Sequence, residues 1–440
     1  MIPLGWEEIA GLRLGQLRGA PNDGVIHRVV DDSRLAGPGD LFVAINSGTR
    51  FVDAALAVGA ATLVPDDQHA ALAALATRVR SRSHARVVAV VGSTGKTSTK
   101  DALAALCAAV TPTVAAEASR NNEIGLPLTV LRLEPDTEVL VTEMGMRGHG
   151  QIAELCAIAR PHVVVVTSIG PEHLELVGTV ADVARANAEA IEALPPGGVA
   201  VVPANTPELE PHLTRDDIEL RRFAADSVAR EKADRPVSDG ANPGARWRFV
   251  VGGTELSLGL PFDQRHLAQN VLAALTAYDA LGLPLGRAQE GAGRIRLSAW
   301  RGELRPLPGG GVVVNDAYNA NPTSMRAALL DLAERAAGRR RVAILGEMAE
   351  LGAESARYHA EIATLLAELG IEVVIAVGEP ARAYLEGVAD GHWIASAESF
   401  REVEDLVHRG DAILVKASRA VGLEGIPASI EKQAVAWSES

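Results

Sequence analysis

The chain has few of the residues that mark several protein classes. Its 440 residues include only two cysteines, Cys107 and Cys156, both in apolar stretches that are expected to form helices. Two buried thiols cannot build a disulfide framework or a cysteine-rich metal site. No apolar run approaches the roughly 20 residues that span a bilayer, and the start MIPLGWEEIA lacks the basic region of a signal peptide. We therefore expect a cytoplasmic protein without membrane insertion.

Positive charge is also scarce, because 42 Lys and Arg stand against 56 Asp and Glu and give a formal net charge of -14. A nucleic-acid surface needs clustered Lys and Arg, so we expect no nucleic-acid partner. A local basic pocket can still hold a small anionic substrate. The 48% hydrophobic and 22% charged content is typical of a globular protein. The length predicts two or three domains, with a monomer as the working expectation.

Three blocks are expected along the chain. Residues 1–83 contain short strand-like runs around a helical segment, and the basic stretch 76–86 is expected to join them to the next block. Residues 84–299 alternate Val-rich runs with amphipathic segments, which predicts a parallel sheet covered by helices on both faces. Residues 300–440 repeat this rhythm as a smaller, Rossmann-like sheet. The predicted fold class is α/β with three domains.

A glycine-rich turn, GSTGKTS, follows the strand-like run VVAVV and opens an amphipathic helix. A standard phosphate loop reads G-x-x-x-x-G-K-[ST], which would require glycine where Val90 stands. The context of strand, loop and helix N-terminus still favours phosphate binding, because free backbone N–H groups point at the anion there. The predicted ATP-binding residues of this loop are Gly92, Ser93, Thr94, Gly95, Lys96, Thr97 and Ser98.

Two further strands end in residues that can bind a metal. Glu143 closes the run EVLVTE, and His173 follows the run HVVVVTSIG. Ligands of open α/β sheets bind at the carboxyl edge of the strands, where both residues are expected. A single histidine after a strand is more often a hydrogen-bonded loop residue than a ligand. Two such residues flanking a phosphate-loop strand predict a metal site.

The order of these motifs resembles the Mur ligases of peptidoglycan synthesis, which join an amino acid or a peptide to a UDP-linked muramyl chain. The family's phosphate loop has the same short G-x-x-G-K-T form, which accounts for the valine at position 90. The first block resembles the family's UDP-binding domain through DDSR and PGDLFVA. The other similar stretches are SRNNEIGLPLTVL (119–131), TEMGMRGHGQI (142–152), IGPEHLE (169–175), RHLAQNVLAAL (265–275), VNDAYNANPTSMRAAL (314–329), GEMAELGAES (346–355) and LVKASR (414–419).

The third-block motifs, above all Y-N-A-N-P-x-S-M, are similar to one member of the family in particular. That member joins D-alanyl-D-alanine to UDP-N-acetylmuramoyl-tripeptide. The resemblance implies these two compounds as substrates, ATP and Mg²⁺ as cofactors, and an acyl phosphate intermediate with release of ADP and phosphate. The third residue of the tripeptide, diaminopimelate or lysine, stays open.

The resemblance also implies a role for each matching residue. Lys96, Glu143, His173 and Arg301 would form the catalytic group, with Thr97, Glu143 and His173 as Mg²⁺ ligands. The remaining ATP contacts would be Asn270 at the adenine, Asp316 at the ribose and Arg301 at the γ-phosphate. The substrate-binding residues would be Ser33 and Arg34 at the uridine, Asn121 and Asn122 near the muramyl group, and Tyr318, Asn319, Lys416 and Ser418 on the third domain.

The sequence departs from the family at two places. Asn187 stands where the family has a lysine whose carbamate helps to place a second Mg²⁺, and asparagine cannot be carbamylated. Either Asn187 orients Mg²⁺-bound water through its carbonyl, or the second metal site is weakened. The loop after GTRF (48–51) is also shorter than is usual, which bears on how the uridine is recognised.

Two other functions remain open at this stage. A ligase of the same fold could act on another acidic substrate, although the Y-N-A-N-P run disfavours the other Mur steps. A P-loop ATPase or binding protein derived from the family could have lost ligation, with Asn187 as the trace of that loss. Formation of ADP that depends on both substrates distinguishes the ligase from the second alternative.

Overall fold

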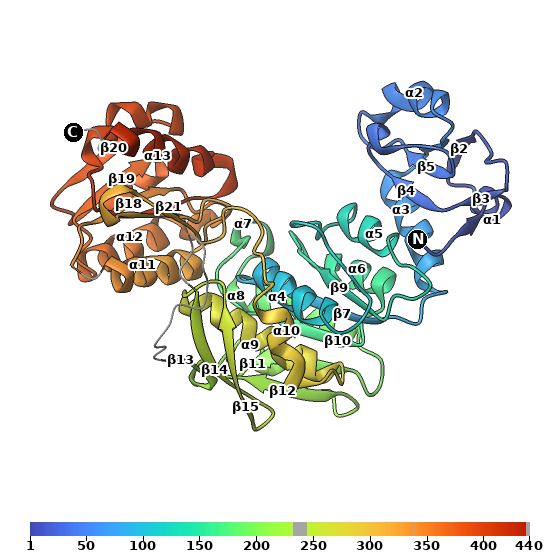
Figure 1. Ribbon diagram of the computed structural model, residues 1–440, viewed down its shortest axis with the longest axis horizontal. Helices are drawn as coiled ribbons and strands as arrows, with labels where there is room; N and C mark the ends of the chain where they lie inside the picture. The colour runs from blue at the N-terminus through green and yellow to red at the C-terminus, as the bar shows by residue number, and fades with distance from the viewer. Residues whose placement is uncertain (232–243, 337, 437–440) are drawn as a thin grey trace.

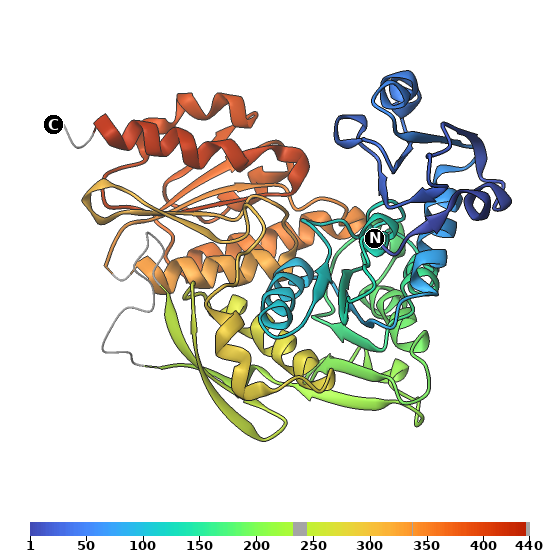
Figure 2. The same cartoon turned by 45° about the vertical axis from the view of Figure 1, so that its right-hand side comes forward.

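Three α/β units follow one another along the chain in the computed structural model, which describes residues 1–231, 244–336 and 338–436. In Figure 1 the second unit lies at the bottom, with the first unit at the upper right and the third at the upper left. The turned view in Figure 2 shows the third unit directly against the second, while the first stands at the other side. The architecture confirms the predicted α/β class.

The first unit is built on a four-stranded sheet in the order β2-β6-β5-β4. Strand β2 is antiparallel to β6, and the other pairs are parallel. A separate antiparallel pair joins β1 to β3. The elements are β1 (Leu4–Gly5), α1 (Trp6–Gly11), β2 (Gly15–Arg18), β3 (Val25–Ile26), β4 (Arg28–Val30), β5 (Asp40–Val43), α2 (Val52–Ala57), β6 (Ala61–Pro65) and α3 (Gln68–Arg80).

The second unit is built on a six-stranded parallel sheet in the order β12-β11-β10-β7-β9-β8. Its strands are β7 (Arg86–Val91), β8 (Thr113–Ala115), β9 (Val139–Glu143), β10 (Val163–Val166), β11 (Val199–Pro203) and β12 (Glu219–Phe223). Its helices are α4 (Lys96–Ala108), α5 (Gly125–Val130), α6 (Gln151–Ala159), α7 (Leu174–Val177), α8 (Val180–Glu192), α9 (Arg265–Ala280) and α10 (Ala288–Ala292).

Alternate residues of β7 explain why this sheet is covered on both faces. Val87, Ala89 and Val91 belong to one apolar cluster, which includes side chains of α5, α6 and α8. Val88 and Val90 belong to a second cluster, with side chains of α4, α9 and α10. Because side chains of a strand point alternately to opposite faces, a continuous Val-rich run needs apolar cover on each side. The predicted parallel sheet between two helical layers is confirmed.

An antiparallel three-stranded sheet extends the second unit and was not predicted. It consists of β13 (Val228–Arg230), β14 (Ala245–Val251) and β15 (Thr254–Leu260). Gly252 and Gly253, both with positive φ, make the tight turn between β14 and β15. Alternate side chains of β14, among them Trp247 and Phe249, are buried in the same apolar cluster as α9.

The third unit repeats the doubly wound plan with one antiparallel edge. Its sheet order is β16-β17-β21-β18-β19-β20, and β16 is the strand that runs antiparallel. The strands are β16 (Glu303–Pro306), β17 (Val312–Asn315), β18 (Arg341–Gly346), β19 (Val373–Val377), β20 (Gly391–Ile394) and β21 (Ala412–Lys416). The helices are α11 (Pro322–Ala336), α12 (Ser355–Glu368) and α13 (Ile426–Ala436).

The expected linker at 76–86 is only partly a linker. Helix α3 continues through its first half and ends at Arg80. Ala76 and Val79 are fully buried in a cluster that includes residues of the second unit, and the Arg80 guanidinium donates to the carbonyl of Ala159. Arg80 thereby satisfies a free carbonyl at the end of α6. Tertiary packing therefore keeps this polar sequence helical.

Both cysteines are buried free thiols, as predicted. Burial raises the pKa of each, Cys107 and Cys156, to about 12. No helix in the described ranges is both long enough and apolar enough to cross a bilayer.

Candidate active site

A cavity of about 860 Å³ opens between the second and third units at the carboxyl edge of the central sheet. Its wall on the second unit consists of the loop after β7, the ends of β9 and β10, and the start of α9. Its wall on the third unit consists of the segments that follow β17, β18 and β21. Ligands of open α/β sheets bind at such edges.

The phosphate loop forms the floor of this cavity. Gly92 and Gly95 have φ values of 120° and 89°, which favour glycine. A Cβ at position 95 would lie 2.5 Å from Oδ1 of Asn270, so a side chain there would displace the amide of Asn270. Helix α4 begins directly afterwards at Lys96. The first turn of α4 therefore faces the cavity with free N–H groups and the positive end of its dipole.

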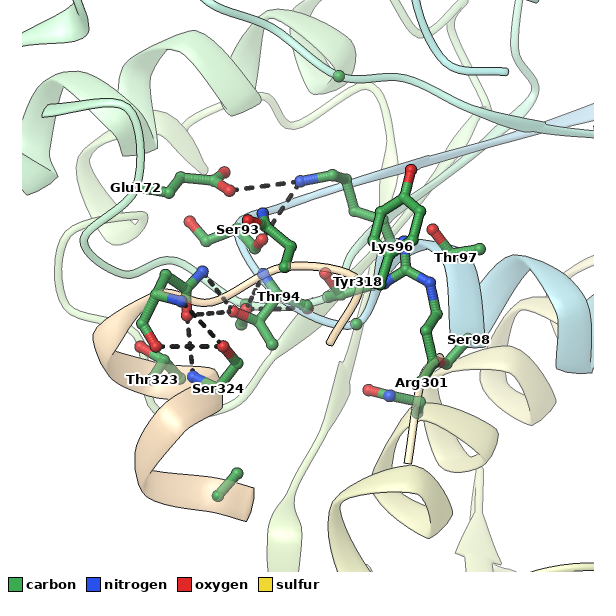
Figure 3. A pocket seen from close by; sticks show the side chains of 18 of the residues that line it. Ser93, Thr94, Lys96, Thr97, Ser98, Glu172, Arg301, Tyr318, Thr323 and Ser324 are labelled. Atoms are coloured by element: carbon green, nitrogen blue, oxygen red, sulfur yellow. Dashed lines mark hydrogen bonds and ion pairs between the residues drawn. The ribbon is translucent and has the colours of Figure 1, made fainter. Parts of the chain in front are cut away.

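The Lys96 ammonium is held inside the cavity by the loop and by one carboxylate. It donates to the carbonyl oxygens of Gly92 and Ser93, and its Nζ lies 3.5 Å from Oε2 of Glu172. Figure 3 shows the side chains of Lys96 and Glu172 pointing toward one another above the loop. The positive charge is therefore within reach of an anion bound on the loop.

Glu143 is the residue that best fits a divalent cation. It is 1% exposed at the end of β9, and its Oε1 accepts from Nδ2 of Asn121 at 2.7 Å. Its Oε2 is buried and has no hydrogen-bond partner among the described residues. Burying a carboxylate oxygen without a partner costs free energy unless a cation or a hydrogen-bond donor contacts it.

The oxygen donors beside the phosphate loop suit Mg²⁺ in their chemistry. Thr97 and Glu143 supply oxygen atoms, and His173 supplies an imidazole nitrogen. No group of three or more His, Cys, Asp or Glu side chains within residues 1–231, 244–336 and 338–436 is arranged to hold a metal alone. Mg²⁺ is usually bound by one or two protein groups together with substrate phosphates and water, so this sparse set fits it.

His173 links the two walls of the cavity. Its backbone is left-handed, with φ 52°, and its Nδ1 is hydrogen-bonded to Oε2 of Glu350 from the third unit. Because a carboxylate only accepts, Nδ1 carries the proton of this hydrogen bond. The backbone adds a bond from the N–H of Glu175 to the carbonyl of Glu350 at 3.0 Å.

The wall from the third unit carries an ordered ion pair. Nζ of Lys416, which is 2% exposed, lies 2.6 Å from Oδ2 of Asp316 and 2.9 Å from the carbonyl of Asn319. Ser418 accepts from the N–H of Ala349 at 2.8 Å. These residues end strands β17 and β21, which are neighbours in the sheet. Lys416 and Asp316 therefore lie together because their strands are neighbours in the sheet.

Arg301 connects this wall to the phosphate loop. Its guanidinium stacks on the ring of Tyr318, with Cζ 3.9 Å from the ring centroid, as Figure 3 shows. One of its terminal nitrogens donates to Oγ of Ser119 at 3.2 Å, and that hydroxyl is 3.4 Å from Oγ1 of Thr97. Stacking holds the cation without neutralising it, so Arg301 can still attract phosphate oxygens.

The cavity brings together most of the predicted site residues. The following predicted residues line it: Ser93, Thr94, Gly95, Lys96, Thr97, Ser98, Asn121, Asn122, Glu143, His173, Asn270, Arg301, Asp316, Tyr318, Asn319, Lys416 and Ser418. Asn122 also has a local structural role, because its Oδ1 accepts from the N–H of Gly125 at the start of α5. Ser33 and Arg34 lie on the first unit, outside this cavity.

Asn187 contacts the phosphate loop from within the core. It is 1% exposed, its Oδ1 accepts from the N–H of Gly92 at 2.7 Å, and its Nδ2 donates to the carbonyl of Val183 at 2.9 Å. The amide therefore supports the phosphate loop from below and does not line the cavity. The proposed orientation of metal-bound water by its carbonyl is not what this geometry favours.

Sequence reasoning missed further residues of the cavity, among them four whose positions carried signals. Glu172 stands directly before His173, and Ser119 opens the quoted stretch 119–131. Asn321 belongs to the Y-N-A-N-P run and exchanges hydrogen bonds with Thr94 at 2.9 and 3.1 Å. Glu350 lies in GEMAELG, a motif quoted for its resemblance but given no role.

Comparison with known proteins agrees with this geometry. The UDP-N-acetylmuramoyl-tripeptide–D-alanyl-D-alanine ligase of Escherichia coli is 31% identical, with 98% of this chain and 99% of that protein covered. The enzyme of the same name from Bacillus subtilis is 30% identical, with 91% and 92% covered.

Solved structures show the same fold. MurF from Acinetobacter baumannii superposes with a TM-score of 0.84 at 27% identity and covers 98% of this chain and 99% of its own. MurF from Thermotoga maritima in complex with ADP gives 0.79 at 26%, with 93% and 98% covered. Residues 90–278 match the family described as Mur ligase middle domain, and residues 300–419 match Mur ligase, glutamate ligase domain. The chain therefore belongs to the Mur ligase family.

Proposed function

We propose that the chain is an ATP-dependent ligase that joins D-alanyl-D-alanine to UDP-N-acetylmuramoyl-tripeptide, with release of ADP and phosphate, in peptidoglycan precursor synthesis. The observation that carries the proposal is the cavity lined by the phosphate loop on one side and by the Lys416–Asp316 pair on the other. Relatives that bear this activity in their names align over nearly the whole chain.

The chemistry requires a carboxylate to become an electrophile. A carboxylate oxygen of the tripeptide attacks the γ-phosphorus of ATP, the bond to ADP breaks, and an acyl phosphate forms. The amine of D-alanyl-D-alanine then attacks the acyl carbon, and the tetrahedral intermediate expels phosphate with loss of a proton. Both steps concentrate negative charge on oxygen atoms, so the site must supply fixed positive charge.

We assign that charge to Lys96 and Arg301, which reach the cavity from opposite walls. Lys96 would neutralise phosphate oxygens above the loop, and Arg301 would approach the γ-phosphate from its stack on Tyr318. Mg²⁺ held by Thr97, Glu143 and His173 would shield the phosphate charge. Asp316, held by Lys416, is placed to accept hydrogen bonds from the ribose, with Asn270 at the adenine.

The remaining assignments concern the ends of the substrates. Ser33 and Arg34 would meet the uridine on the first unit, Asn121 and Asn122 the muramyl group, and Tyr318, Asn319 and Ser418 the incoming peptide. We propose domain boundaries at 83/84 and 299/300, so that the first unit holds the uridine contacts, the second the muramyl contacts and the third the contacts to the incoming peptide. Because ATP and a UDP-linked precursor are both intracellular metabolites, we place the reaction in the cytoplasm.

Formation of ADP tests the proposed function. The purified chain should release ADP only when UDP-N-acetylmuramoyl-tripeptide and D-alanyl-D-alanine are both present, and the product should carry five residues by mass spectrometry. Lys96→Met should lower the rate at least about hundredfold, because it removes a charge that acts on the transition state. Lys432→Met, at an exposed position on α13, is the matched control and should leave the rate unchanged.

Other outcomes discriminate among the alternatives. ATP turnover indifferent to both substrates would overturn ligation and favour an ATPase derived from the family. ADP formation with another amine acceptor in place of D-alanyl-D-alanine would point to a sibling ligase.

A further inference from the structure

Arg301 lies in the segment 293–302, which joins the second unit to the third and belongs to no helix or strand. A segment of this kind has no regular hydrogen bonding of its own, so its course depends on contacts with the units around it. A guanidinium that meets a phosphate group must be held at a fixed distance from the phosphate loop. The contacts on either side of Arg301 therefore decide where its side chain can reach.

Asp101 holds the segment before Arg301. Its Oδ2 accepts from the N–H of Ser298 at 2.8 Å and from the hydroxyl of the same residue at 2.9 Å. Its Oδ1 accepts from the ammonium of Lys100, so both carboxylate oxygens are engaged and the side chain is fixed in one orientation. Asp101 belongs to α4, the helix that begins at Lys96. The helix that ends the phosphate loop therefore also fixes the start of the segment.

Gln264 holds the segment directly after Arg301. The residue is 0% exposed at the start of α9, and its Nε2 donates to the carbonyl of Gly302 at 2.8 Å. Its Oε1 is buried and has no hydrogen-bond partner in the described part of the chain. Because burying an amide oxygen without a partner costs free energy, the stability of the core does not account for a glutamine here. What Gln264 supplies is its contact with Gly302.

The backbone between these two contacts has an uncommon conformation. Trp300 has φ 60°, in the left-handed region that residues other than glycine seldom adopt. Such a conformation persists only where the surrounding structure determines it. The third unit supplies the contacts, because the carbonyl of Trp300 accepts from the N–H of Tyr318 at 3.2 Å and Arg419 stacks on its ring, with Cζ 4.3 Å from the centroid. Arg301 therefore follows a residue whose conformation is fixed from both units.

We propose that Asp101 and Gln264 are positioning residues for Arg301. They hold the backbone on either side of it, so that its guanidinium, stacked on Tyr318, reaches a γ-phosphate bound on the phosphate loop. Neither residue lines the cavity, so both act through the arginine. The proposal rests on the proposed ATP-dependent function, in which Arg301 meets the γ-phosphate. Binding of ADP, which has no γ-phosphate, does not depend on this arrangement.

Nucleotide affinity tests the proposal without any turnover. Calorimetric titration of the full chain, with Mg²⁺ present, compares ADP with the β,γ-imido analogue of ATP. Gln264→Met removes one hydrogen bond, so it should weaken binding of the analogue about fivefold and leave the affinity for ADP unchanged. Ser298→Ala removes one of the two bonds to Asp101 and should weaken binding of the analogue about twofold.

A double variant shows whether these residues act through the arginine. Arg301→Met should weaken binding of the analogue more than either single variant and leave ADP binding unchanged. Gln264→Met should then add no further loss when it is combined with Arg301→Met, because two changes in one chain of contacts are not additive. A residue that only stabilises the fold would add its full effect in both backgrounds.

The matched control is Gln433→Met on α13. Nε2 of Gln433 also donates to a carbonyl at 2.8 Å, that of Glu404, and its Oε1 is likewise buried without a partner among the described residues. This variant should change neither affinity. Circular dichroism and thermal melting establish that each variant is folded, and Ser298→Ala carries the test if Gln264→Met does not fold.

Three results would overturn the proposal. These are equal losses for ADP and the analogue in Gln264→Met, no loss for either nucleotide, and the same loss whether or not Arg301 is present. Failure of the proposed function has a different signature, because ADP release would then be independent of the two substrates, whereas these affinities are measured without them.

Discussion

The central unit meets its two neighbours through interfaces that differ in their polar contacts. Toward the first unit, helix α3 packs on α5 and α6. The side chains between them are apolar and fully or nearly fully buried, for example Leu72, Leu75 and Leu126 in one continuous cluster. Toward the third unit the same apolar cluster continues, for example with Leu174 and Leu351, and hydrogen bonds and ion pairs are added to it: Thr94 with Asn321, His173 with Glu350, and Asp263 with Arg335.

The difference shows which boundary can open. Separating an apolar interface exposes apolar surface to water, which costs about 25 cal/mol of free energy for each Å². Hydrogen bonds and ion pairs can be exchanged for water at a much smaller net cost, about 1 kcal/mol for an ordinary hydrogen bond. The comparison predicts that the third unit separates from the centre more readily than the first, which would admit ATP, and that it closes again to exclude water.

Removing Arg335 should have the largest effect on the polar boundary. Its guanidinium bridges Asp263 of the second unit at 2.7 Å and Asp331 of α11 at 3.3 Å, and each side chain is about 10% exposed. Burial raises the pKa of Asp331 despite the charge of Arg335. Arg335→Met leaves the buried Asp331 without its arginine and leaves Asp263 with Arg230 at 3.4 Å, and breaking such a buried pair costs about 3–5 kcal/mol.

We expect Arg335→Met to enlarge the radius of gyration in small-angle X-ray scattering and to lower kcat/KM. The control is Arg357→Met, at an exposed arginine that pairs with Glu354 and Glu361 within the third unit. An unchanged scattering profile and unchanged kinetics in Arg335→Met would show that this pair does not hold the boundary.

Leu75→Ala tests the apolar boundary. Leu75 is 0% exposed in α3, and a buried leucine replaced by alanine costs about 2–5 kcal/mol of unfolding free energy. The denaturation midpoint should fall while the scattering profile of the native protein stays the same. Leu330→Ala, at a leucine that is 48% exposed on α11, should change neither quantity. A more open native profile for Leu75→Ala would contradict a fixed first interface.

Thr94→Val should have the smallest effect. It removes the hydroxyl that exchanges hydrogen bonds with Asn321 and leaves the loop backbone intact. One hydrogen bond contributes about 1 kcal/mol, so KM for ATP should rise roughly fivefold with denaturation unchanged. Thr364→Val, whose hydroxyl bonds within α12, is the control. A large loss of stability would mean that Thr94 serves the fold and not the closure.

Much of the fold was predictable because burial shows directly in the sequence. The Val-rich run of β7 predicted a strand covered on both faces, and G-S-T-G-K-T predicted the turn into α4. The sheet β13 to β15 was missed, although β14 alternates buried and exposed residues before Gly252 and Gly253. That alternation is typical of a half-buried strand. It was missed because only helices and fully buried strands were sought.

From the residues alone, site residues could be predicted only where they come directly after the end of a strand. Glu143 and His173 could be placed together because parallel strands share a carboxyl edge. The pairing of His173 with Glu350 spans 177 residues and depends on how two units dock, which no local pattern encodes. The role of Asn187 was open for the same reason, since its partner Gly92 lies 95 residues away.

The amide at position 187 has a consequence for how the protein responds to its surroundings. A carbamate forms only by reaction with dissolved carbon dioxide and is lost when that gas is depleted, whereas an asparagine side chain is permanent. Support of Gly92 by Asn187 therefore does not vary with the gas dissolved in the medium. Activity in degassed, bicarbonate-free buffer should equal activity in buffer equilibrated with air.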